Sequence, residues 1–227
     1  MAVFRLKTFP TSTENPIRWS YDRAELLADG VMHLLGVGLG IVAIAICVVR
    51  LATGDDRYDI SIYLTVLVMM LGLSAMYNLW PVSPLKWLLR RFDHAVIYLL
   101  IAATYTPFLS EVHNRTFAMV FLIAVWSTAL AGAILKVAFP GRFDGLSIGV
   151  YLALGWSGIF AYDKAVAALS LSTLILIAVG GLLYTIGVMF HTWERLRFQN
   201  ALWHGFVLLA AGCHFAAVIG LEIHPSA

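Results

Sequence analysis

Residues 31–51 read VMHLLGVGLGIVAIAICVVRL, and no charged side chain lies between His33 and Arg50. An α-helix rises about 1.5 Å per residue, so a helix of this length crosses the roughly 30 Å hydrocarbon core of a bilayer. The residues before it lack the basic, apolar and small-residue order of a cleavable signal. The stretch therefore predicts a retained membrane-spanning helix.

Six further apolar blocks follow along the 227-residue chain. They cover residues 59–80, 93–110, 116–138, 145–162, 165–190 and 201–222. The composition agrees, because 61% of the residues are hydrophobic and only 12% are charged, against about 25% charged in soluble domains. We therefore expect an all-α integral membrane protein, a seven-transmembrane helix bundle over residues 25–222, with terminal segments 1–24 and 223–227.

Basic residues in the connections predict the orientation, because cytoplasmic loops of membrane proteins are enriched in Lys and Arg. One side of the bundle carries eleven of them: Arg5, Lys7, Arg18, Arg23, Lys86, Arg90, Arg91, Lys136, Arg142, Arg195 and Arg197. The other side carries four: Arg50, Arg57, Arg115 and Lys164. We therefore expect a cytoplasmic N-terminus and an external C-terminus. The net charge of +2 gives no reason to expect nucleic acid as a partner, so membrane lipid is the expected one.

Polar side chains lie near the ends of four predicted spans, although an ionisable side chain in a span costs about 2.5 to 3.5 kcal/mol to insert. By the predicted orientation they all lie near the cytoplasmic side. Spacings of four residues place the members of a set on one helical face. The sets are Glu25, Asp29 and His33; Ser74 and Asn78; Asp93 and His94; and Asn200 and His204. We interpret them as one polar site.

Several of these residues also have a simpler structural interpretation. Glu25 and Asp29 could lie at the solvated entrance of the first span, where the positive end of the helix dipole favours carboxylates. Asp93 could cap the N-terminus of the third span. His214 lies deep in the last span, and we expect it to form an interhelical hydrogen bond outside the site. Pro107 predicts a kink in the third span.

Five phrases of the sequence together resemble one family. They are Glu25 to His33 with Gly36; Ser74-Ala75-Met76-Tyr77-Asn78; Asp93-His94-Ala95-Val96-Ile97-Tyr98 with Ala102-Ala103-Thr104-Tyr105-Thr106-Pro107; Gly180-Gly181-Leu182-Leu183-Tyr184; and Trp203-His204. The family is that of the bacterial hemolysin III proteins, related to the progestin and adipoQ receptors and more distantly to alkaline ceramidases. The resemblance covers about residues 20–220, and it implies a seven-helix bundle in the bacterial inner membrane with a cytoplasmic N-terminus.

The resemblance also implies where a zinc ion would bind. In eukaryotic relatives three histidines hold zinc, one from a Ser-x-x-x-His pattern in the second span and two from a His-x-x-x-His pattern in the seventh. An aspartate at the start of the third span holds the metal-bound water. Ser74, Asp93 and His204 match these patterns, whereas Asn78 and Asn200 stand at the other two ligand positions.

This departure bears on the cofactor. An amide oxygen is a poor substitute for the imidazole, thiolate or carboxylate that zinc prefers. We therefore expect no cofactor. Zinc is the alternative, with His33 or His94 as a replacement ligand.

Three functions stay open. The leading hypothesis is a non-catalytic protein that senses a lipid or maintains the membrane, with the amides in a hydrogen-bond network that replaces the metal. The second is metal-dependent hydrolysis of a lipid amide such as ceramide, with Asp93 as base and Ser74 stabilising the oxyanion. The third is a pore, as the family's hemolysin label and implied cytolysis suggest, with a proton path through Glu25, Asp29, His33 and Asp93.

Overall fold

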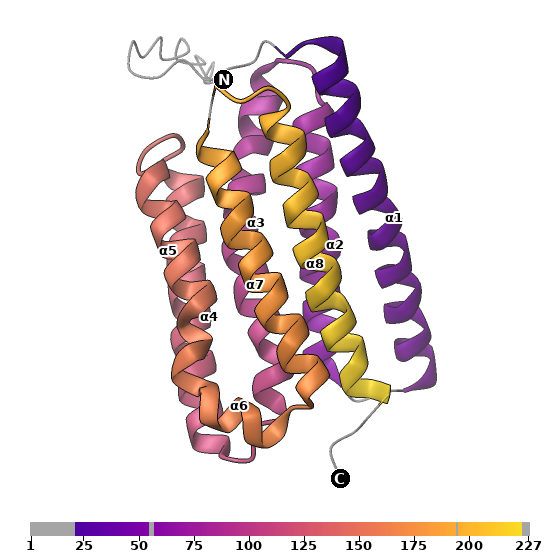
Figure 1. Cartoon of the computed structure of the whole chain (residues 1–227), viewed down its shortest axis with the longest axis vertical. Coiled ribbons are helices and arrows are strands. Elements are labelled where there is room, and N and C mark those ends of the chain that lie inside the picture. The colour runs from indigo at the N-terminus through magenta and orange to yellow at the C-terminus, as the bar shows by residue number, and fades with distance from the viewer. Residues whose placement is uncertain (1–20, 55–56, 194, 224–227) are drawn as a thin grey trace, which may run out of the picture.

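The computed structural model describes residues 21–54, 57–193 and 195–223. Within these ranges seven segments are helical, long and apolar enough to cross a membrane, which confirms the predicted all-α fold with seven spans. The elements in Figure 1 are α1 (Arg23–Thr53), α2 (Tyr58–Leu79), α3 (Pro84–Ser110), α4 (Arg115–Ala138), α5 (Asp144–Trp156), η1 (Ser157–Ala161), α6 (Tyr162–Ala168), α7 (Leu171–Thr192) and α8 (Gln199–Ile223). Of the predicted terminal segments, residues 1–20 and 224–227 lie outside the described residues.

Successive spans run in opposite directions. As a result α1, α3, α5 and α8 begin at the upper end of Figure 1, and α2, α4 and α7 end there. We call this the upper end of the bundle. It is the end that the distribution of basic residues predicts to be cytoplasmic, and that orientation stays a prediction.

The first span begins earlier than its hydrophobicity predicts, at Arg23 rather than at residue 31. Asp22 and Glu25 explain the early start, because each side chain accepts the backbone N–H of the other, at 2.8 and 2.9 Å. This reciprocal cap satisfies two N–H groups of the first helical turn. The Glu25 N–H, together with the nearby Arg197 guanidinium, holds the pKa of the exposed Asp22 carboxyl below its usual value.

The third span also begins earlier, at Pro84 rather than at residue 93. Ser83 caps the helix by accepting the backbone N–H of Lys86 at 3.3 Å, and proline is favoured at the first helical position because it has no N–H to satisfy. Asp93 therefore lies inside α3, and its interpretation as an N-cap is wrong. The helix continues through Pro107 to its end at Ser110.

The fifth span is broken into α5, η1 and α6, and the connection to the next span lies at residues 169–170. The predicted boundaries at 162 and 165 were wrong for this reason. At the break, the hydroxyl of Tyr105 accepts the N–H of Gly158 and donates to the carbonyl of Gly155, both at 2.7 Å. A side chain of α3 thus satisfies backbone groups that the interrupted helix leaves without partners.

The helices surround a core that α2, α3 and α8 share. The side chains of Tyr63, Leu64 and Leu67 on α2, Val96 on α3 and Val218 on α8 are almost completely buried. Helix α1 packs against α2 and α8 at the side of the bundle. Its outer face exposes large apolar side chains, including Leu27, Leu34, Ile41 and Val49. An apolar surface of this kind suits contact with lipid, and it leaves the inner face of α1 to form a site with α2 and α8.

Candidate functional site

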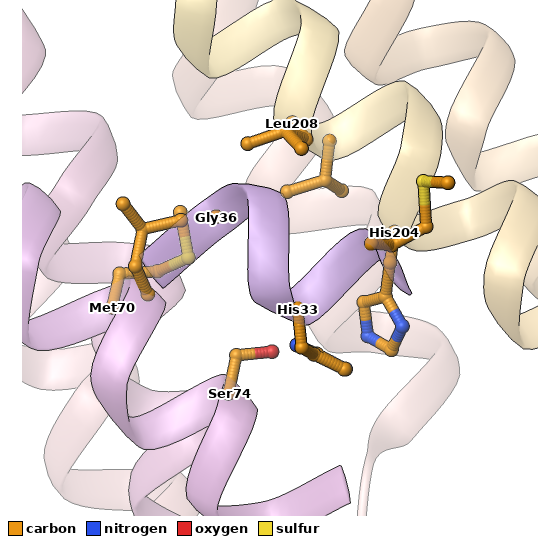
Figure 2. A pocket seen from close by; sticks show the side chains of 9 residues that line it. His33, Gly36, Met70, Ser74, His204 and Leu208 are labelled. Carbon is orange, nitrogen blue, oxygen red and sulfur yellow. The ribbon is translucent and has the colours of Figure 1, made fainter. Parts of the chain in front are cut away.

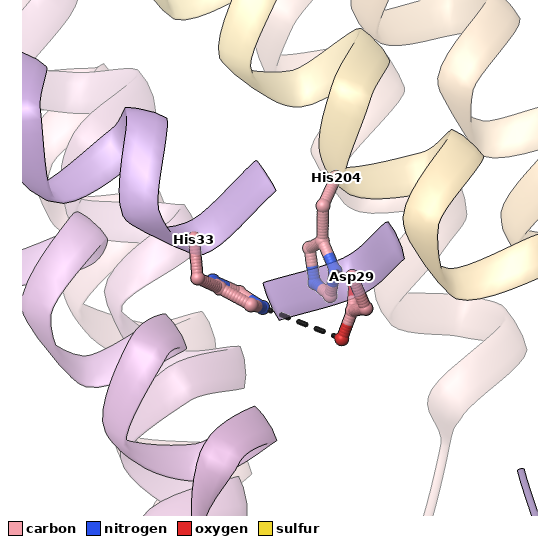
Figure 3. Close-up of side chains that lie close together, drawn as sticks. All are labelled: Asp29, His33 and His204. Atoms are coloured by element: carbon pink, nitrogen blue, oxygen red, sulfur yellow. Dashed lines mark hydrogen bonds and ion pairs between the residues drawn. The ribbon is translucent and has the colours of Figure 1, made fainter. Parts of the chain in front are cut away.

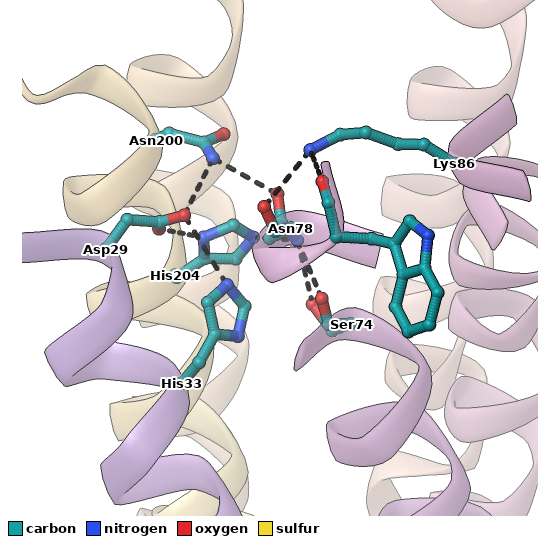
Figure 4. A network of polar contacts seen from close by, with 8 residues as sticks. Asp29, His33, Ser74, Asn78, Lys86, Asn200 and His204 are labelled. Atoms are coloured by element: carbon teal, nitrogen blue, oxygen red, sulfur yellow. Dashed lines mark hydrogen bonds and ion pairs between the residues drawn. The ribbon is translucent and has the colours of Figure 1, made fainter. Parts of the chain in front are cut away.

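Three helices bring polar side chains together at the upper end. Asp29 and His33 come from α1, Asn78 from α2, and Asn200 and His204 from α8 (Figure 4). The spacing of four residues places both members of a pair on one face of α1 and of α8. Because α2 ends where α8 begins, the last turn of α2 meets the first turns of α8 beside α1.

Asp29 lies at the centre of this network and is only 7% exposed. Its Oδ2 accepts a hydrogen bond from Nδ2 of Asn200 at 3.1 Å, and its Oδ1 lies 2.5 Å from Nδ1 of His204. A buried carboxylate is costly unless such groups satisfy it. Both contacts reach α8, so Asp29 joins the first and last spans.

Asn78 extends the network to α2. Its Oδ1 accepts from Nδ2 of Asn200 at 3.2 Å, and its Nδ2 donates to the backbone carbonyl of Ser74 at 2.9 Å. The same Nδ2 lies 3.5 Å from Nε2 of His204. If that nitrogen accepts, the imidazole proton is on Nδ1, and His204 donates it to Asp29. The amides therefore link all three helices.

Lys86 also belongs to the network, although the sequence identified it only as a basic residue of a connection. Its Nζ donates to the backbone carbonyls of Asn78 at 3.1 Å and Trp80 at 2.8 Å. These carbonyls lie at the C-terminal end of α2, where the helix supplies no partner of its own. No spacing in the sequence indicates this contact, because Lys86 follows the turn after α2.

His33 is buried but incompletely satisfied. Its Nε2 lies 3.5 Å from Oδ2 of Asp29 (Figure 3), yet this nitrogen makes no hydrogen bond within the described residues. Its ring centroid is 4.4 Å from that of His204. A cavity of about 20 Å³ borders both histidines and Ser74 (Figure 2). That volume is enough for about one water molecule.

The residues of α3 divide between this site and another environment. Asp93 lies close enough to Ser74 and His204 to interact electrostatically with both. The ring of His94, by contrast, lies edge-on to that of Tyr77, with 6.4 Å between the ring centroids. The group of three potential metal ligands within the described residues contains His33 and not His94.

Two other titratable residues have structural contacts outside the network. Glu25, besides its capping role, accepts the backbone N–H of Phe198 at 3.2 Å and so holds the segment before α8. His214 donates from Nε2 to the backbone carbonyl of Ile177 on α7 at 3.3 Å. The expected interhelical hydrogen bond of His214 is thus confirmed.

The ligand positions that the resemblance assigns to zinc do not fit that ion. Both amide nitrogens are engaged as hydrogen-bond donors, and the Asn78 oxygen accepts from Asn200. Only His204 offers a ligand that zinc favours at these three positions. A different group of residues forms a potential metal site. One ligand atom each from Asp29, His33 and His204 lie within 4.8 Å of one another.

Comparisons with known proteins identify the family. The family model described as "Haemolysin-III related" matches residues 24–215. The chain is 36% identical over 199 residues to a protein of Bacillus subtilis (strain 168) named "Hemolysin-3 homolog", a match that covers 86% of this chain and 93% of the relative. It is 30% identical over 210 residues to "Hemolysin-3" of Bacillus cereus, with 91% and 96% covered.

A human relative extends the similarity to eukaryotes. The protein named "Monocyte to macrophage differentiation factor" is 31% identical over 127 residues, which are 56% of this chain and 52% of the human protein. This match supports the relation to the progestin and adipoQ receptors that the motifs predicted. No solved structure matches the chain. With its seven spans and its Bacillus relatives, the chain is a multi-pass bacterial membrane protein that belongs to the haemolysin-III-related family.

Proposed function

We propose that this chain is a non-catalytic membrane protein that senses bilayer lipid or maintains the membrane. The observation that carries the proposal is the hydrogen-bonded series Asn78, Asn200 and Asp29, which joins α2, α8 and α1. Two of these residues stand where the family resemblance implies metal-binding histidines. The amides thus connect the helices that a metal would otherwise connect.

The size of the cavity beside the site supports a non-catalytic role. Its volume of about 20 Å³ is far below the roughly 300–1,000 Å³ of sites that bind small molecules. A lipid acyl chain requires more space than one water molecule. Hydrolysis of a lipid amide at Asp93 and Ser74 would therefore require these helices to move apart first.

The position of α1 suggests how lipid would act on the network. The outer face of this helix is apolar and exposed, with Leu27 and Leu34 each 71% exposed. Its inner face is held to α8 through Asp29, and Asn200 on α8 links Asp29 to Asn78 on α2. A change in bilayer thickness alters the tilt of a spanning helix. Tilting α1 would move Asp29 relative to Asn200 and His204.

The second candidate is the lipid amide hydrolase, because Asp93 lies near Ser74 and His204 as that chemistry needs. We would incubate the purified full chain with ceramide in detergent and measure released fatty acid by mass spectrometry. Asp93→Asn is the matched control. We expect equal, background release from both proteins. Release that the native chain shows and Asp93→Asn lacks would contradict the non-catalytic proposal.

A second experiment tests lipid sensing directly. The native chain and Asn200→Ala are reconstituted in phosphatidylcholine vesicles with acyl chains of increasing length, and their unfolding temperatures are compared. We expect the native unfolding temperature to depend on chain length and the variant to depend on it less. If the unfolding temperatures of both proteins depended equally on acyl-chain length, the amide network would have no part in the response to lipid.

A further inference from the structure

We infer that Asp29, His33 and His204 bind one divalent transition-metal ion, through a ligand set displaced from the family positions onto α1. This goes beyond the proposed function, since lipid sensing through the amide network requires no metal. Two imidazoles and one carboxylate are a ligand set that Zn²⁺ and other first-row divalent ions accept. Two of the three ligands come from α1, and neither Asn78 nor Asn200 takes part as a ligand.

The spacing of the ligand atoms is compatible with one ion. Tetrahedral bonds of about 2.0–2.2 Å place ligand atoms roughly 3.3 Å apart. Oδ1 of Asp29 and Nδ1 of His204 are 2.5 Å apart, whereas Oδ2 of Asp29 and Nε2 of His33 are 3.5 Å apart. All three ligand atoms lie within 4.8 Å of one another. Shifts of about 1 Å would therefore place each of them at bonding distance from a single metal ion.

The burial of His33, and the absence of a hydrogen bond at its Nε2 within the described residues, point to a ligand. His33 is only 6% exposed, and its Nε2 makes no hydrogen bond within the described ranges. An unsatisfied buried polar group is costly, and a native protein that keeps one does so for a reason. This nitrogen faces the Asp29 carboxylate (Figure 3), and the small cavity borders the His33 and His204 side chains (Figure 2). The room available suits one ion or one water molecule.

Charge and the surrounding amides support the same assignment. The Asp29 carboxylate lowers the cost of placing a cation at this depth, since buried charges need a partner of opposite sign. Asn200 donates to Oδ2 of Asp29 at 3.1 Å and so fixes the orientation of the carboxylate. Hydrogen bonds from residues behind the ligands commonly orient metal ligands in this way. The amide network would thus support the metal site as well as join the helices.

The first experiment measures metal in the native chain. The full-length protein is purified in detergent after removal of any affinity tag, without added metal or chelator, and its metal content is measured by inductively coupled plasma mass spectrometry. We expect about one transition-metal ion per chain. We expect Asp29→Asn and His33→Asn each to lower the content at least fivefold. His191→Asn, which removes a half-buried histidine outside the group of three, should retain the ion.

A titration keeps the inference testable if a variant fails to fold. The native chain is stripped with chelator, returned to buffer and titrated with Zn²⁺ while its unfolding temperature is followed. At a Zn²⁺ concentration about a hundred times the Kd, we expect an increase of roughly 5–10 °C. The inference would be overturned if the native protein contained no metal and its unfolding temperature did not change on addition of Zn²⁺. Metal retained in both Asp29→Asn and His33→Asn would overturn it equally.

These outcomes are independent of the proposed function. A chain that binds metal and releases fatty acid contradicts the non-catalytic proposal but not the ligand set. A chain that binds no metal yet responds to bilayer thickness contradicts the ligand set but not the lipid-sensing proposal. The double substitution Asn78→His with Asn200→His is a further comparison, because it restores the family's histidines. If His33→Asn empties the native protein but not this double variant, the two ligand sets are distinct.

Discussion

Two polar clusters at the upper end of the bundle differ in how completely their charges are paired. Between α3, α4 and α5, Lys136 forms an ion pair with Asp144, and Arg90 approaches the same carboxylate at 3.2 Å. Lys136 is only 5% exposed. Between α1, α2 and α8, the network around Asp29 leaves Nε2 of His33 without a hydrogen bond to any described residue, beside a cavity.

The difference separates structural polarity from a candidate binding site. The buried Lys136 ammonium is paired with Asp144, whose side chain is 43% exposed, so this cluster needs no further partner and its role is to hold helices in place. A buried imidazole beside a carboxylate and a cavity has unused binding capacity. Both clusters look alike in the sequence, where each is a few ionisable residues near the ends of apolar blocks. Substitutions in the two clusters should therefore have different effects on stability and on metal binding.

The largest effect is expected from Asp144→Ala. It leaves the buried Lys136 ammonium without the carboxylate that it contacts. Because the Asp144 side chain is 43% exposed and water reaches the site, we expect a cost of about 3 kcal/mol, the lower end of the range for breaking a buried pair. We expect the unfolding temperature in detergent to fall by roughly 6–10 °C. Asp163→Ala is the control, because Asp163 on α6 is exposed. Equal changes in the two variants would show that the ion pair contributes little.

A smaller effect is expected from Gly132→Ala, which tests the packing of α3 against α4. A Cβ at Gly132 would lie 2.5 Å from the ring of Tyr98, which is 3% exposed and has little room to move. Overpacking of this kind costs about 1–3 kcal/mol. At Gly38 on α1 an added Cβ meets no atom of the described residues within 4 Å, so Gly38→Ala should leave the unfolding temperature unchanged or slightly raised. If Gly38→Ala were destabilising and Gly132→Ala were not, α1 rather than the contact between α3 and α4 would be the tightly packed region.

The amide network is expected to contribute less than the ion pair. Asn200→Ala removes hydrogen bonds to Asp29 and Asn78, at a cost of about 1–2 kcal/mol. A double-mutant cycle with Asn78→Ala should give a coupling free energy of about 0.6 kcal/mol, the average for interhelical hydrogen bonds in membranes. A coupling of zero would mean that the two amides do not act together.

The smallest change is expected from His33→Leu in the presence of chelator. Because Nε2 makes no hydrogen bond to any described residue and only a 3.5 Å contact with Asp29, replacing the imidazole with an apolar side chain should change the free energy of unfolding by less than about 1 kcal/mol. The same variant should lose the stabilisation by Zn²⁺ that we expect of the native chain. A large loss of stability in chelator would instead assign His33 a structural hydrogen bond.

The sequence was sufficient for the number of spans, because hydrophobicity over about twenty residues is a local property that decides whether a helix can lie in lipid. It also singled out Asp29, His33, Asn78, Asn200 and His204, since ionisable and amide groups near apolar blocks are rare enough to stand out, but it did not indicate Lys86. Spacings of four residues correctly placed Asp29 with His33 and Asn200 with His204 on single helical faces. Span ends were less accurate, because the caps at Asp22 and Ser83 extend helices beyond their apolar blocks.

Only the tertiary structure decided which of these groups meet. Nothing local to α1 indicates that Asp29 contacts His204 on the last span, or that the hydroxyl of Tyr105 occupies the break in the fifth. Such contacts depend on how each helix is rotated and which helix lies next to it, and a single sequence contains no local signal for either. The sequence therefore determined the membrane fold and the chemistry available, whereas helix packing decided that ligand atoms of Asp29, His33 and His204 lie within 4.8 Å of one another, while the amides of Asn78 and Asn200 pair with each other.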